Sequence, residues 1–164
     1  MALLTGLLLT MGGCNDDDSP GSSLDFVSEV EIQDVNGQAI DAAGRGSDVD
    51  VVLSIRNRSD AETTLEFDST RRSDFLVLNA AGEVVRIWSS QRSFSPTVTT
   101  EDFDAGERKT FEMEWSDLSG DNGDPLPAGE YEVQAWAATE EEDGIDNLSP
   151  GPLRSTLKTF EITD

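Results

Sequence analysis

Few residue types in this chain could carry out catalysis. The sequence has no histidine, which removes the Ser-His-Asp triad, the Cys-His pair and histidine-based metal sites. Carboxylates are abundant, with 34 acidic residues against 11 basic ones. A catalytic carboxylate pair, however, needs a shaped pocket that separates the two pKa values, and no part of the sequence indicates one. We therefore expect a protein that is not an enzyme and that needs no cofactor.

Oxygen ligands gather in one loop, WSDLSGDNGDPLPAG, from 115 to 129. Asp117, Asp121, Asn122 and Asp124 lie there among glycines, and carboxylate and amide oxygens are ligands for Ca²⁺. The spacing differs from that of an EF-hand loop. A solvated loop in which Asp, Asn and Gly serve turn geometry is the alternative. We keep Asp117, Asp121 and Asp124 as weak calcium candidates.

The single cysteine follows an apolar run that extends from Ala2 to Met11. That run is shorter than the about 20 residues needed to cross a bilayer, but it fits the apolar region of a signal peptide. The residues Met11-Gly12-Gly13-Cys14 resemble a bacterial lipobox. The resemblance implies that residues 1–13 are removed and that Cys14 is lipidated, with the protein facing the periplasm or cell exterior. The alternative is that the apolar run forms an N-terminal core strand.

Residues 15–23, NDDDSPGSS, contain nothing that could contribute to a core. We expect 14–23 to be a lipidated cysteine followed by a flexible acidic tether reaching roughly 15 to 18 Å. The net charge of −23 opposes contact with nucleic acid and with anionic lipid headgroups. The anchor would therefore be the only membrane contact, and no nucleic acid is expected among the partners.

From residue 24 to 164, apolar and polar residues alternate with the period of two that is typical of β-strands. Turn residues separate about eight such runs, and no helical stripe is sustained. We predict one all-β domain, an antiparallel β-sandwich. The predicted strands are Phe26–Ile32, Val49–Ile55, Thr63–Phe67, Asp74–Leu78, Val84–Trp88, Arg108–Trp115, Glu130–Ala137 and Ser155–Ile162.

Two of these runs predict a hairpin around the turn Asn79–Gly82, with apolar residues on both faces. The inner face is predicted to hold Phe75, Val77, Val85 and Ile87, and the outer face Leu76, Leu78, Val84 and Trp88. Because monomeric proteins rarely leave large apolar patches bare, we expect the connection Ser89–Gly106 to cover the outer face.

The connection Ser89–Gly106 is long for a link between sandwich strands, and long loops in compact domains are commonly functional. Arg92, Phe94 and Pro96 combine a cation, an aromatic ring and a stiff backbone, which suit a protein-binding hot spot. The alternative is that Phe94 packs near Trp88 as part of the fold.

Four stretches resemble, in order, blocks of the BsuPI family, named for a bacterial intracellular proteinase inhibitor. They are VVLSIRNRSDAETTLEF, SDFLVLNAAGEVVRIWS, AGERKTFEMEWSD and PLPAGEYEVQAW, and they cover about Val49 to Ala137. The resemblance implies an immunoglobulin-like sandwich that binds a proteinase or another protein. The inhibitor that gives the family its name works inside the cell, whereas this chain carries the marks of export, so its target does not carry over.

Two functions of different classes follow from the sequence. The first is a membrane-anchored lipoprotein, expected to be a monomer, whose domain binds a protein partner, with proteinases among the candidates. The second is an envelope-associated structural lipoprotein without inhibitory activity.

Overall fold

The computed structural model describes residues 25–139 and 148–164. Ten strands and two short 3-10 helices make up this part of the chain. The strands are β1 (Phe26–Gln33), β2 (Ala42–Gly44), β3 (Val49–Asn57), β4 (Thr63–Phe67), β5 (Ser73–Asn79), β6 (Val84–Ile87), β7 (Thr99–Phe103), β8 (Arg108–Trp115), β9 (Gly129–Ala137) and β10 (Lys158–Thr163). The 3-10 helices are η1 (Trp88–Gln91) and η2 (Ser116–Leu118).

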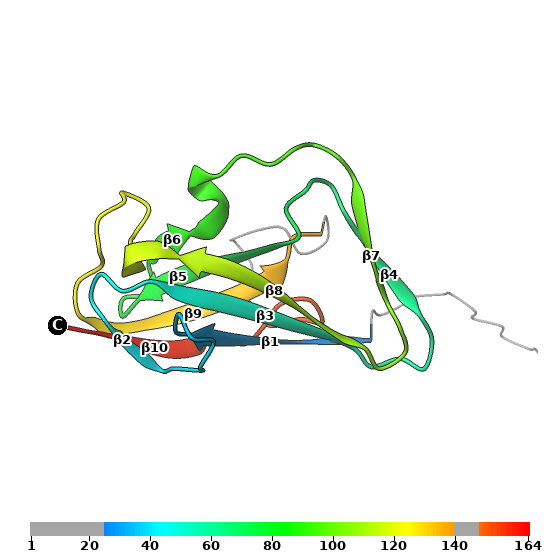
Figure 1. Ribbon diagram of the computed structural model, residues 1–164, viewed down its shortest axis with the longest axis horizontal. Coiled ribbons are helices and arrows are strands. Elements are labelled where there is room, and N and C mark those ends of the chain that lie inside the picture. Colours follow the sequence, from blue (N-terminus) through cyan, green and yellow to red (C-terminus); the bar gives the residue numbers. More distant parts are fainter. Residues whose placement is uncertain (1–24, 140–147) are drawn as a thin grey trace, which may run out of the picture.

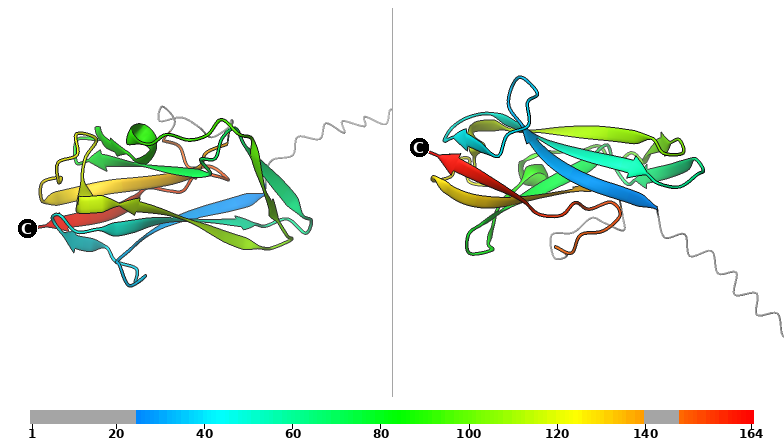
Figure 2. Two further views of the ribbon diagram at one scale, coloured as in Figure 1. Left: turned by 45° about the horizontal axis from the view of Figure 1, so that its top comes forward. Right: turned by 90° about the horizontal axis from the view of Figure 1, so that it is seen from below.

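The strands form two facing sheets and a separate two-stranded ribbon (Figures 1 and 2). One sheet has the order β1-β3-β8 and the other β2-β10-β9-β5-β6, while β4 pairs only with β7. All pairings are antiparallel except that of β2 with β10. The predicted all-β sandwich is therefore confirmed, with β2 and β7 added to the strands expected from the sequence.

The core lies between the sheets and is built from the alternating apolar residues of β1, β3, β5, β8, β9 and β10. Trp115, Phe75 and Phe160 are fully buried in it, and the Trp115 ring centroid lies 5.9 Å from that of Phe75 and 6.1 Å from that of Phe160. Burial of such rings removes 150–250 Å² each from water and is, at roughly 25 cal/mol per Å², the main stabilising contribution.

A tyrosine hydrogen bond holds the backbone where β9 begins. The hydroxyl of Tyr131 donates to the carbonyl oxygen of Pro127 at 2.8 Å, and burial raises the pKa of this phenol. A tyrosine that bonds to the backbone a few residues upstream at a sheet corner is typical of immunoglobulin-like sandwiches. The Pro-Ala-Gly-Glu-Tyr run noted in the sequence is thus a corner of the fold.

The hairpin of β5 and β6 differs from its prediction in one respect. Phe75, Val77 and Val85 face the main core as expected, and Leu76 and Leu78 belong to a second, outer cluster. The register shifts between Val77 and Leu78, so that Val77 lies opposite Arg86 and Leu76 opposite Ile87. The predictions for Ile87 and Trp88 are therefore wrong: Ile87 packs in the outer cluster and Trp88 against the main core.

The cover of the outer face was also predicted wrongly. Among the described residues, the partly buried apolar side chains packed on the cluster of Leu76, Leu78 and Trp136 are Ile87 and Leu148. Leu148 comes from the segment before β10, and its carbonyl oxygen accepts a hydrogen bond from the buried side chain of Gln134 at 3.0 Å. The connection Ser89–Gly106 instead forms η1, an exposed segment and β7.

The β4–β7 ribbon is joined to the sandwich by Asn57, at the end of β3. The buried side-chain amide of Asn57 donates to three carbonyl oxygens, those of Ala61 at 2.8 Å, Phe103 at 3.1 Å and Asp104 at 3.1 Å. Its side-chain oxygen accepts from Ser59. One residue thus links the end of β3, the start of the ribbon and the end of β7.

Candidate functional site

Four side chains stack on the side of the sandwich, with two adjacent aromatic rings between two cations. The guanidinium carbon of Arg92 lies 4.2 Å from the centroid of the Trp88 ring, and the Trp88 and Phe94 rings are 5.8 Å apart at 39°. The guanidinium carbon of Arg71 lies 5.9 Å from the Phe94 centroid. We call Arg92, Trp88, Phe94 and Arg71 the cation–aromatic stack.

Trp88 begins η1 and closes the side of the sandwich between β6 and β8. Its indole nitrogen donates to the carbonyl oxygen of Glu114 on β8 at 3.1 Å, while its ring is half-buried against the core. Asp121 holds η1 from the other side, accepting from the amide of Ile87 at 3.1 Å and from the hydroxyl of Ser90 at 2.7 Å. The position of the Trp88 ring is therefore fixed by the sandwich itself.

A buried carboxylate positions Arg71 at one end of the stack and the backbone next to Trp88. Asp74 is 1% exposed; one of its oxygens accepts from Arg71 at 2.8 Å, and the other accepts from the amide of Ser89 at 3.1 Å. Burial raises the pKa of this carboxyl, while its hydrogen bonds to Ser89 and the charge of Arg71 act in the opposite direction. Asp74 thereby connects the cation over Phe94 to the residue that follows Trp88.

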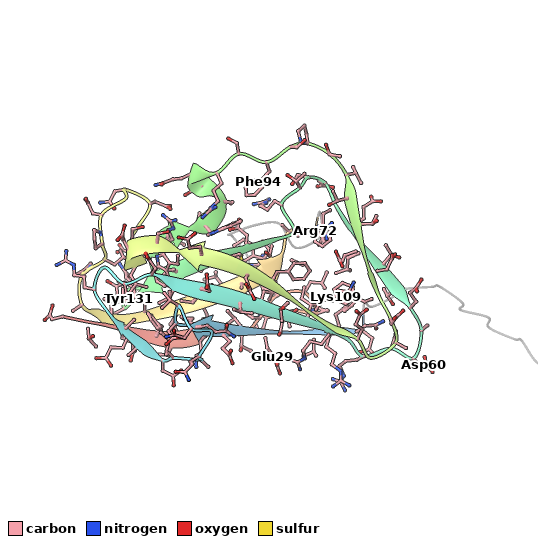
Figure 3. All side chains as sticks on the ribbon, viewed as in Figure 1. Glu29, Asp60, Arg72, Phe94, Lys109 and Tyr131 are labelled. Carbon is pink, nitrogen blue, oxygen red and sulfur yellow. The ribbon has the colours of Figure 1, made fainter. Side chains whose placement is uncertain are left out.

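Residues Arg92–Val98, which we call the arch, run from η1 to β7 outside both sheets (Figure 1). Every residue of the arch is exposed except Phe94, which is half-buried, and Val98 is 59% exposed. Ser95 ties the arch down, because its carbonyl oxygen accepts from the Thr70 amide at 3.0 Å and its amide donates to the Thr70 hydroxyl at 3.0 Å. Figure 3 shows Phe94 beneath the arch, away from Tyr131 at the far corner.

The stack is locally cationic in a strongly acidic chain. Arg86, 7% exposed, lies beside it; burial lowers the pKa of Arg86, the charge of Asp121 acts in the opposite direction, and the charge of Arg92 lowers the pKa further. At the ribbon, by contrast, Arg72 and Lys109 both pair with Glu101. The guanidinium of Arg92 therefore stands out as an exposed cation against an aromatic face.

The structure brings two of the three predicted binding residues together. Arg92 and Phe94 both belong to the cation–aromatic stack, whereas Pro96 lies in the arch beyond the residue that ties it down. The Phe94 ring packs on Trp88, as the alternative interpretation expected, and is half-exposed, while its role in binding stays a prediction from the sequence. Arg71 was missed, because nothing in the sequence places the segment before β5 beside the arch.

The acidic loop that contains η2 uses its oxygens for its own turns. Asp121 bonds to β6 and η1, and the carboxylate of Asp124 accepts from the side-chain amide of Asn122 at 2.9 Å. Asp117 has a positive φ of 56° and its amide donates to Asp48. No group of three His, Cys, Asp or Glu that could hold a metal occurs within residues 25–139 and 148–164. The calcium site remains a prediction from the sequence.

The predicted lipid-attachment residue, Cys14, and the tether lie outside the described residues. In the part of the chain that the structure describes, no helix is long and apolar enough to cross a bilayer.

Solved structures match this chain at low identity and with TM-scores below 0.5. The C-terminal domain of Wzt matches with a TM-score of 0.48 and 13% identity, covering 84% of this chain and 74% of that one. A CARDB domain from Pyrococcus furiosus, solved with two metal ions, matches with 0.43 and 15%, covering 85% and 88%. A β-glucosidase from Erythrobacter marinus matches with 0.43 and 14% over 84% of this chain, which spans only 15% of that enzyme. None of these likenesses carries a functional argument, and no curated protein matches the sequence.

A family model provides the assignment. It matches residues 38–142, from the segment before β2 to beyond the end of β9, and so takes in η1, the arch and the segment that supplies Arg71. Because the match spans more than half of the chain, this protein belongs to the BsuPI family, described as intracellular proteinase inhibitor.

Proposed function

We propose that this chain is an exported lipoprotein, anchored through Cys14, whose BsuPI domain binds a protein partner through the cation–aromatic stack and the arch. A proteinase is the first partner to test, because the family is described as a proteinase inhibitor. The stack is the observation that carries the proposal.

The composition of the stack favours protein binding. Tryptophan and arginine are enriched among the residues that dominate binding energy at interfaces, and a half-buried aromatic ring gives a partner an apolar contact. Arg71, Asp74 and Ser89 already hold the stack together in the free protein. Little side-chain entropy would therefore be lost when a partner docks.

The anchoring part of the proposal is supported by the lipobox resemblance at Cys14 and by the place where the sandwich begins. The carbonyl oxygen of Asp25, the first described residue, accepts from the amide of Arg58 at 2.7 Å, close to the ribbon. The C-terminus lies at the opposite end of the molecule (Figure 2). A tether that leaves at Asp25 would put the ribbon end toward the membrane and keep the arch on the side of the domain, open to a partner.

The test is inhibition of a panel of bacterial serine proteinases by the purified full-length protein in detergent. We expect at least one enzyme of the panel to be inhibited in proportion to the added protein. An Arg92→Ala, Phe94→Ala double variant should inhibit that enzyme much more weakly.

The structural-lipoprotein alternative predicts a different result. It predicts no inhibition across the panel, and recovery of envelope components alone when the protein is used as bait. That pair of results would contradict the proposed function.

A further inference from the structure

The arch presents unused backbone hydrogen-bonding groups on its outer side. Within the described part of the chain, the amides of Phe94 and Val98 have no hydrogen-bond partner. Pro96 has no amide hydrogen and fixes its own φ. A backbone with open donors and acceptors is a ready template for pairing with another chain.

The arch is nevertheless held firmly at its base. The Phe94 ring rests on Trp88, Ser95 is bonded twice to Thr70, and the hydroxyl of Thr99 donates to the carbonyl oxygen of Ser69 at 3.1 Å. Residues 69–71, between β4 and β5, thus support the arch from beneath. Only Pro96, Thr97 and Val98 stand between the last two ties, and all three are exposed.

The geometry of the ties determines which groups face outward. Arg92 enters the arch with extended backbone angles, φ −118° and ψ 153°, and no residue of the arch has a positive φ. In an extended chain, the amide and carbonyl of neighbouring residues point to opposite sides. Since the amide and carbonyl of Ser95 face Thr70, an extended course through the arch would direct the backbone groups of its neighbours Phe94 and Pro96 away from the protein.

We propose that Phe94–Val98 is the segment that enters the active-site cleft of a partner proteinase, where it pairs through its backbone as a short added strand. This inference rests on the proposed function and adds the mode of binding to it. Proteins commonly recognise extended segments by backbone pairing, with pockets that receive alternate side chains. A proteinase is the partner that fits best, because the family is described as a proteinase inhibitor and a short, supported arch can enter a narrow cleft.

The arrangement also explains why the stack lies beside the arch. With Phe94 fixed on Trp88 and Arg71, the arch keeps its shape as its outer edge is desolvated. Arg92 then lies at the rim of the contact, where an exposed cation affects the rate and specificity of docking more than its strength.

The first experiment compares an active proteinase with the same enzyme whose catalytic serine has been sulfonylated by phenylmethylsulfonyl fluoride. The enzyme is the one from the panel that the full-length protein inhibits most strongly. We expect the blocked enzyme to bind the full-length protein at least tenfold more weakly, because its cleft is occupied. Equal binding of both forms would place the contact outside the cleft and overturn the inference, while the proposed function would stand. If neither form is bound, the proposed function fails and the inference with it.

The second experiment removes one backbone amide from the outer edge. A Val98→Pro variant loses an amide hydrogen that has no partner in the free protein, so its melting temperature should stay close to that of a Val98→Ala control. The control removes the same side chain and keeps the amide. We expect the proline variant to bind the active enzyme at least tenfold more weakly than the control. Equal affinity of the two variants would show that the backbone of the arch is not paired in the complex.

Discussion

Phe94 is the residue whose environment separates a core role from a binding role most clearly. A fully buried phenylalanine costs about 3 to 5 kcal/mol when truncated, whereas Phe94 is half-exposed and loses mainly its contacts with Trp88 and Arg71. Phe94→Ala should therefore lower the free energy of unfolding by about 1 to 2 kcal/mol in urea titrations. Val98→Ala, at an exposed position of the arch, is the control and should change it little. A loss of about 3 kcal/mol or more would assign Phe94 to the core.

The raised pKa of Asp74 predicts how the free energy of unfolding changes with pH. Burial raises its pKa above the ordinary value of 3.8, so the folded protein holds this proton more tightly than the unfolded chain does. The resulting stabilisation is present below pH 3.8 and is lost as the pH rises through the folded pKa. Asp74→Asn removes that contribution. The stability difference between wild type and variant should therefore shrink as the pH rises from acid to neutral, measured by urea unfolding at each pH. A difference that grows with pH would show that the attraction to Arg71 outweighs burial.

At the residue level, the sequence was informative where one short stretch contains both partners. Arg92, Phe94 and Trp88 lie within a few positions of each other, so their proximity could be anticipated. Arg71 reaches Phe94 only because the segment between β4 and β5 runs beneath the arch, and Asp74 gains its role only when β5 brings it beside Ser89. Such contacts depend on the sheet topology, which no local pattern shows.

Among the elements, the β4–β7 ribbon depends most on a single side chain. Asn57→Asp would remove the two amide hydrogens that serve three carbonyl oxygens and would place a negative charge against them. We expect a loss of at least about 3 kcal/mol, since an unpaired buried charge costs more than a lost hydrogen bond. Ser59→Ala, which removes one bond to the Asn57 oxygen, should cost about 1 kcal/mol. Thermal and urea unfolding provide both values, and an Asn57→Asp variant as stable as the Ser59 variant would contradict this role.

The sequence predicted those strands in which one buried face makes apolar and polar residues alternate. It missed the strands that lack this alternation. β1, β3, β4, β8 and β9 were anticipated to within a residue or two, because each presents an apolar face to the core. β2 has three small residues, and β7 reads Thr-Thr-Glu-Asp-Phe with only Phe103 buried, so neither shows a pattern. The shift of register after Val77 moved Ile87 and Trp88 to unexpected faces, since an offset of one residue reverses the face of every later side chain.

The whole molecule carries a net charge of −23, and this charge predicts how stability responds to salt. Self-repulsion destabilises a compact state, and the screening length falls from about 10 Å at 0.1 M salt to about 3 Å at 1 M. The melting temperature should therefore rise with sodium chloride. A value that stays flat or falls between low and molar salt would show that local pairs, such as those of Glu101 with Arg72 and Lys109, already compensate the acidic charge.

The proposed cellular location predicts the fate of a Cys14→Ser variant. Because Cys14 is the sole cysteine and would carry the lipid, its replacement should move the protein from the membrane fraction to the soluble fraction. Mass spectrometry of the native protein checks the chemistry directly. An unmodified Cys14 with residues 1–13 still attached would contradict the lipoprotein proposal.

The central claim is that the cation–aromatic stack and the arch form the binding surface, and an affinity comparison tests it most directly. The dissociation constant of the inhibited proteinase is measured for the wild type, for an Arg92→Ala, Phe94→Ala double variant, and for Val35→Ala. Val35 is an apolar residue that is 77% exposed in the turn after β1, outside the stack and the arch, and its truncation is therefore the control. The account predicts that the double variant binds roughly thirtyfold more weakly or worse, about 2 kcal/mol, while Val35→Ala binds as the wild type does. Undiminished binding by a folded double variant would contradict it.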